Sequence, residues 1–88
     1  MLMKIYQVVQ REFYISNGCD YLNACSPFGK GLGYKSIKTA EMIANNLYNE
    51  YKELNNNGFC SGNGVNFTAQ VATPTMRIVI TIEEILIK

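Results

Sequence analysis

Residues suited to binding an anion are concentrated in one loop, from Gly29 to Ser36, just before the only long helical pattern of the chain. Glycines let a ligand approach the backbone closely, and the free N–H groups at a helix N-terminus attract anions. Two lysines in the loop add positive charge. If the protein binds a nucleotide or another small anion, we expect the site to use four residues of this loop: Gly31, Gly33, Lys35 and Ser36.

The loop differs from a phosphate-binding loop in both spacing and setting. That motif needs G-x-x-x-x-G-K-[ST] after a buried parallel strand. Here Tyr34 separates Gly33 from Lys35, and the surrounding strand patterns indicate an antiparallel sheet. The simpler interpretation, which we favour, is that the glycines form a flexible connection to the helix.

Catalytic and metal-binding side chains are scarce in this sequence. It has no histidine, which is the commonest general base and a common metal ligand. The three cysteines, Cys19, Cys25 and Cys60, form no C-x-x-C pair, whereas structural zinc sites usually have four ligands. We therefore expect no enzymatic activity, no metal and no cofactor. An odd number of cysteines also argues against a disulfide framework and favours a cytoplasmic protein.

Aromatic residues are more numerous than a small core requires. The chain of 88 residues has six tyrosines and four phenylalanines. Tyrosine is favoured at interfaces, because it offers apolar area with a polar tip. The alternative is that the tyrosines cover the open face of a sheet that one helix cannot cover. We predict an interaction surface that includes four of them: Tyr6, Tyr14, Tyr21 and Tyr34.

The elements that would position these residues follow from hydrophobic periodicity. Alternation predicts four strands, and Asn17-Gly18 predicts a tight hairpin between the first two, because both residues tolerate positive φ. Pro27 should end the second strand, since it cannot donate a ladder hydrogen bond. The segment 59–64 is expected to be a loop. The predicted strands are residues 4–16, 19–25, 65–72 and 76–82, and the pattern of the last allows it to extend to Ile87.

One amphipathic helix is predicted from Ile37 to Leu54, with Ser36 as its N-cap. The order β-β-α-β-β indicates an α+β fold in a single domain, in which a four-stranded antiparallel sheet carries the helix on one face. The isoleucine-rich last strand is expected at a sheet edge. An apolar edge strand invites pairing, which predicts a homodimer.

The charge and hydropathy of the chain bear on two further partners, nucleic acid and membrane. Net charge is only +1, which argues against strong binding to phosphate backbones. The segment Gly33–Glu41 nevertheless resembles the strand-to-helix corner of small DNA-binding integrase arm domains, which implies a weak nucleic-acid-binding module. The basic residues available for a nucleic-acid-binding patch are Lys4, Arg11, Lys30, Lys35, Lys38 and Arg77.

A membrane-spanning segment is not expected, because no apolar run approaches the ~20 residues of a membrane span.

The function that we expect is stoichiometric binding of a host protein. Abundant asparagine and isoleucine are typical of AT-rich genomes, including those of phages and mobile elements. Phage anti-defence proteins, among them anti-CRISPR inhibitors, are similar in size and in their lack of catalytic motifs. By this analogy, the protein would act in the host cytoplasm and inhibit or modulate its partner. The alternatives are the nucleotide- or anion-binding protein and the nucleic-acid-binding module described above.

Overall fold

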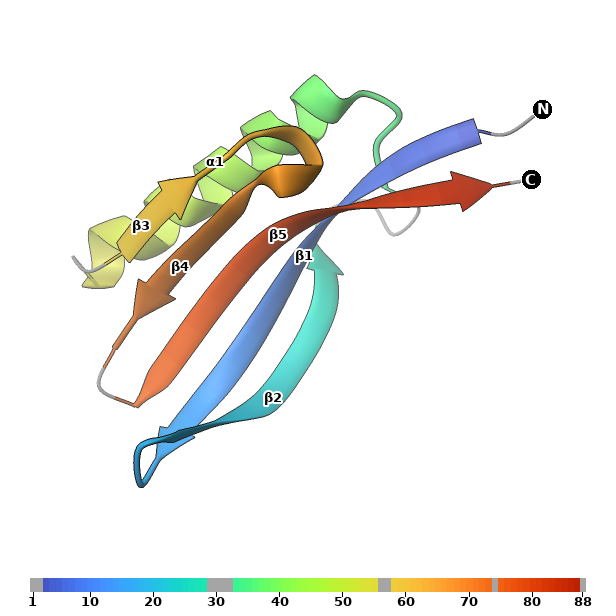
Figure 1. The fold of residues 1–88 in the computed structure, drawn as a ribbon. Helices are drawn as coiled ribbons and strands as arrows, with labels where there is room; N and C mark the ends of the chain where they lie inside the picture. The colour runs from blue at the N-terminus through green and yellow to red at the C-terminus, as the bar shows by residue number, and fades with distance from the viewer. Residues whose placement is uncertain (1–2, 29–32, 56–57, 74, 88) are drawn as a thin grey trace.

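The protein folds as one helix packed on one antiparallel sheet (Figure 1). The computed structural model describes residues 3–28, 33–55, 58–73 and 75–87. The α+β class and the single helix are therefore confirmed for this part of the chain. The elements are β1 (Met3–Ser16), β2 (Cys19–Phe28), α1 (Ile37–Asn55), β3 (Gly58–Ser61), the 3-10 helix η1 (Gly64–Asn66), β4 (Thr68–Ala72) and β5 (Met76–Ile87).

The sheet has five strands in the order β2-β1-β5-β4-β3, which corrects the predicted four. The additional strand is β3, in a segment expected to be a loop. It pairs with β4 from Gly58↔Val71 to Ser61↔Thr68. The tight return depends on Gly62, whose φ is +76°, and where a Cβ would lie 2.3 Å from a backbone oxygen. A four-residue strand bounded by glycines has too short an alternation to be recognised from sequence.

The position of β5 corrects a second expectation. It lies in the middle of the sheet, paired with β1 on one side and β4 on the other, and not at an edge. Its apolar residues alternate onto both faces: Ile78, Ile80 and Ile82 share one, while Val79 and Ile85 share the other. A strand that is apolar on both faces suits the centre of a sheet better than its edge.

Two strand boundaries also differ from the predicted ones. β2 continues through Pro27 to Phe28. This is compatible with proline because β2 is an outer strand, so its unpaired side needs no donor. β4 begins at Thr68 rather than at residue 65, because η1 precedes it with hydrogen bonds from Asn66 to Asn63 and from Phe67 to Gly64.

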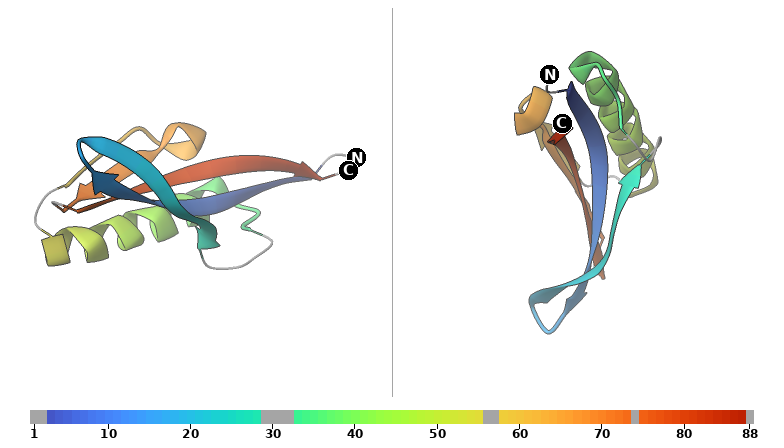
Figure 2. Two further views of the ribbon diagram at one scale, coloured as in Figure 1. Left: turned by 90° about the horizontal axis from the view of Figure 1, so that it is seen from below. Right: turned by 90° about the vertical axis from the view of Figure 1, so that its right-hand side faces the viewer.

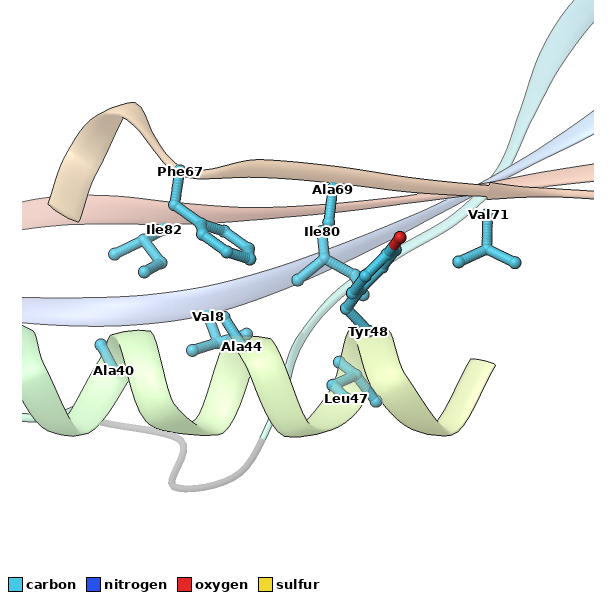
Figure 3. Packing of buried hydrophobic residues seen from close by; sticks show 10 residues of the cluster. All are labelled: Val8, Ala40, Ala44, Leu47, Tyr48, Phe67, Ala69, Val71, Ile80 and Ile82. Atoms are coloured by element: carbon cyan, nitrogen blue, oxygen red, sulfur yellow. The ribbon is translucent and has the colours of Figure 1, made fainter. Parts of the chain in front are cut away.

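The core lies between α1 and the face of the sheet formed by β1, β5 and β4 (Figure 3). Small residues on both sides, Ala40 and Ala44 on the helix and Ala69 on β4, allow the helix to lie close to the strands. Tyr48 of the helix is buried as well. The buried cluster comprises Val8, Ala40, Ala44, Leu47, Tyr48, Phe67, Ala69, Val71, Ile80 and Ile82.

α1 is shorter than the strand beneath it. Nineteen helical residues span about 28 Å, whereas the fourteen residues of β1 span about 46 Å. The described chain is accordingly elongated, with extents of 48 × 23 × 20 Å. The end of the β1–β2 hairpin therefore extends beyond the helix (Figures 1 and 2).

Candidate functional site

The loop before α1 is attached to the sheet through Tyr34. The Tyr6 N–H donates to the Tyr34 carbonyl oxygen at 2.7 Å, and the Tyr34 N–H donates back to the Tyr6 carbonyl at 2.8 Å. Gly33 makes this approach possible. Its φ is +88°, and a Cβ there would lie 3.0 Å from both the Tyr6 carbonyl oxygen and the Gln7 side chain. A side chain at Gly33 would therefore disturb the attachment of the loop to β1.

Of the other three residues of the predicted anion site, the structure describes two, Lys35 and Ser36. The Ser36 hydroxyl accepts from the Thr39 N–H at 3.4 Å, so it caps the helix as predicted. Lys35 is exposed beside it. Gly31 lies outside the described residues. Gly33 and Ser36 are both engaged in local structure, and the ligand site at this loop stays a prediction.

The four predicted interface tyrosines divide into two pairs. Tyr6 and Tyr34 are half-buried and pack against the core cluster near the start of α1. Tyr14 and Tyr21 are direct partners across β1 and β2. They are 54% and 56% exposed, although they lie on the face of the sheet that α1 covers elsewhere. Only the second pair is available for a large contact.

An irregularity in the β1–β2 ladder brings Tyr14 and Tyr21 together. The pairing register shifts between Glu12 and Phe13, so that Glu12↔Ala24 is followed by Phe13↔Leu22. One residue of β2 is skipped, which is the arrangement of a β-bulge. Without it, Leu22 would oppose Tyr14, and Tyr21 would lie on the other face.

Leu22 is a further exposed apolar residue of this hairpin, and the sequence analysis did not single it out. It is 59% exposed and lies opposite Phe13, on the face of the sheet that α1 does not cover. Arg77 covers the Phe13 ring, with its guanidinium carbon 4.8 Å from the ring centroid. The sequence places Leu22 in a predicted strand but does not show which face of the sheet it occupies. That face is decided by the bulge, which cannot be recognised from the sequence. We call Tyr14, Tyr21 and Leu22 the hairpin surface.

The hairpin turn holds this surface in a fixed geometry. Asn17 and Gly18 both have positive φ, 53° and 78°, as the two-residue turn predicted from the sequence requires. The Ile15 N–H also donates to the Thr75 carbonyl at 2.8 Å, which ties the hairpin to the β4–β5 connection. Three exposed apolar side chains are therefore presented by paired backbone and not by a free loop.

The basic residues do not form one patch. Lys4 pairs with Glu84 at 3.2 Å, while Arg11 pairs with Glu83 at 2.6 Å and donates to the Thr81 hydroxyl at 3.0 Å. By strand alternation, Lys4 and Arg11 lie on opposite faces of β1. Lys35 and Lys38 are near the start of α1, and Lys30 lies outside the described residues. The predicted nucleic-acid interface gains no continuous positive surface from this arrangement.

The described residues contain neither a metal-binding cluster nor a membrane-spanning helix. Within them, no three His, Cys, Asp or Glu side chains are grouped as a metal site would require. The two cysteines whose side chains are described, Cys19 and Cys60, are free thiols and exposed. In the same part of the chain, no helix is long and apolar enough to cross a bilayer.

Comparison with known proteins gave no relative: no protein-family model, curated protein or solved structure matches the chain. The hairpin surface is therefore a candidate site on the evidence of its exposure and position alone.

Proposed function

We propose that the protein is a non-enzymatic binding protein that docks onto another protein through the hairpin surface. The observation that carries the proposal is the adjacency of Tyr14 and Tyr21, both more than half exposed, at the end of a hairpin that α1 does not cover. Leu22 adds apolar area on the opposite face of the same hairpin. The partner that the sequence favours is a host protein met by a phage or mobile-element product.

The chemistry of the surface defines the kind of partner that it fits. Tyrosine and tryptophan anchors dominate binding energy when they fill pockets of a partner, and a tyrosine hydroxyl needs a hydrogen-bond partner there. The complementary surface is an apolar cleft with carbonyl or carboxylate acceptors at its base. A narrow hairpin that enters such a cleft would inhibit the partner by occlusion, without any chemical step.

The pre-formed hairpin lowers the entropic cost of binding. The two strands are paired up to the turn, so docking has to order only side chains and not backbone. Immobilising each side chain costs about 0.5–1.5 kcal/mol. A pair of fixed aromatic side chains is therefore a more effective anchor here than it would be on a flexible loop.

The test compares matched surface variants in capture from a lysate of the natural host. Tyr14→Ser with Tyr21→Ser removes the anchor, whereas Met42→Ser removes a residue that is 56% exposed on α1. We expect one protein to be retained by the wild type and by Met42→Ser. The tyrosine variant should bind it at least ~30-fold more weakly, as for an interface hot spot. Equal retention by all three proteins would exclude the hairpin surface as the binding site.

A further inference from the structure

The described sheet has several places where a strand has no neighbour. β2 and β3 are the outer strands. In addition, β1 pairs with β2 only from Val8 onward, and β5 pairs with β4 only up to Thr81. Each place leaves backbone donors and acceptors that a further strand can pair with, and proteins usually block such edges with charge, proline or a covering segment.

Three of these four edges carry such a feature. β2 contains Asp20 and Pro27 in its sequence. The first residues of β1 are bridged at Tyr6 by Tyr34. The last residues of β5 include Glu83 and Glu84, two like charges in succession.

β3 has none of these protections. Its sequence, Gly58-Phe59-Cys60-Ser61, contains neither charge nor proline. Phe59 is 53% exposed and points to the face that α1 does not cover, opposite Gln70. Cys60 and Ser61 are exposed as well. β3 is therefore the edge of the described sheet best suited to pair with another strand.

We propose that β3 pairs antiparallel with β3 of a second copy of this chain, about a two-fold axis, so that the two sheets become one. Such an axis places one residue opposite its own copy, here Phe59 or Cys60. A charged residue at that position would repel itself, whereas β3 is uncharged throughout. The contact completes an exposed edge on both copies at once.

The side of α1 next to β3 gives a second reason for choosing this partner. Glu41 accepts from the Gly64 N–H at 2.9 Å, and Tyr48 lies next to Gly58, so both face this side. Lys52 lies over the Tyr48 ring at 5.9 Å. These three residues are spaced by seven and four, which places them on one stripe of the helix.

The stripe is acidic at one end and basic at the other. Glu41 and Lys52 are eleven residues apart, or about 16 Å along the helix. α1 lies behind β3 and β4 (Figure 1), so the two-fold axis sets the two helices antiparallel on the same face of the joined sheet. Glu41 of each copy then approaches the Lys52 end of the other. Helix contact is needed, because four paired residues alone bury far less than the roughly 1,200 Å² of a specific interface.

The first test is sedimentation equilibrium of the wild type and of two lysine variants. Cys60→Lys puts a charge at the two-fold axis or, in the register centred on Phe59, beside it. Leu22→Lys puts the same charge on an exposed side chain of the opposite outer strand. We expect a wild-type dimer, a Leu22→Lys dimer of unchanged affinity, and a Cys60→Lys dimer weakened at least about tenfold by like-charge contact. Circular dichroism confirms that each variant is folded.

Two results would overturn the proposal. One is a wild type that stays monomeric at its highest soluble concentration, which would leave β3 free or available to a different protein. The other is a dimer that Leu22→Lys breaks and Cys60→Lys does not, which would move the contact to the hairpin.

A cross-linking experiment tests the contact without altering β3. Residues opposite each other across antiparallel strands have Cβ atoms ~4.5–5.5 Å apart, and diagonal neighbours ~7–8 Å, so a short bis-maleimide reaches between two Cys60 thiols in either register. The Cys19→Ser, Cys25→Ser variant should give a covalent dimer. The Cys60→Ser, Cys25→Ser variant, which keeps only Cys19, should give none. Equal yields from the two variants would contradict pairing through β3.

Discussion

The two halves of β1 lie in different surroundings although they share one alternating pattern. In the first half, Ile5, Val8 and Val9 are buried, and Val8 is fully so. From Arg11 to Ser16 no side chain is buried. The difference does not come from residue type, because Phe13, Tyr14 and Ile15 are as apolar as the residues of the first half. On the face where Val8 and Tyr14 lie, it comes from α1, which packs on Val8 and ends before the strand reaches Tyr14. Ile5 and Val9 lie on the opposite face and outside the cluster under α1.

Stability and binding should depend on different halves of the molecule. The covered half, with α1, β4 and β5, contains the whole buried cluster, so it should determine most of the free energy of unfolding. The hairpin half adds little burial and presents the hairpin surface. Substitutions in the two halves should therefore have different effects.

The largest effect is expected in the covered half. Ile80→Ala removes a fully buried side chain at the centre of the sheet. It should lower the free energy of unfolding by ~2–5 kcal/mol, through lost burial and the cavity left behind. Urea denaturation measures the change. A loss below about half a kcal/mol would mean that the core does not lie under α1.

An intermediate effect is expected from a pair of glycines, one in each half. Both Gly33 and Gly18 have positive φ, so alanine at either is strained by about 1–2 kcal/mol. Only at Gly33 would the new Cβ also press on a neighbour, the Tyr6 carbonyl, whereas nothing lies within 4 Å at Gly18.

Gly33→Ala should therefore destabilise the protein more than Gly18→Ala, as measured by thermal or urea unfolding. If the two variants are equally stable, the attachment of the loop to β1 contributes nothing beyond its backbone conformation.

The smallest effect on stability is expected in the hairpin half. Leu22→Ala should change the free energy of unfolding by no more than ~0.5 kcal/mol, as for most exposed positions. Tyr14→Ala should cost below ~1 kcal/mol, the upper range for a cross-strand pair. Both values come from the same urea titrations. A loss above about 2 kcal/mol at either position would show that the hairpin surface is part of the core.

Several elements could be predicted because local chemistry specifies them. The bounds of α1 followed from Ser36 and from apolar residues at spacings of three and four, and the hairpin followed from Asn17-Gly18. β3 and the bulge in the β1–β2 ladder could not be predicted. β3 has only four residues, too few for an alternating pattern to be recognised, and the bulge depends on a single skipped residue of β2.

For the candidate site, the sequence identified Tyr14 and Tyr21 but placed Tyr6 and Tyr34 in the same surface. All four are tyrosines in or next to strands, and nothing local distinguishes them. Which two are covered depends on where α1 and its preceding loop lie. The same holds for the sheet edges, since apolar composition pointed to β5 as the pairing edge, whereas β1 and β4 occupy both of its sides.

Residues within a few positions of one another specify the α+β class, the helix and its cap, the first hairpin and the two faces of β1 and β5. The order of the strands and the exposure of the individual tyrosines are settled only in the folded molecule. These depend on contacts between distant segments, above all on the pairing of β1 with β5 and on a helix about 18 Å shorter than the strand that it covers.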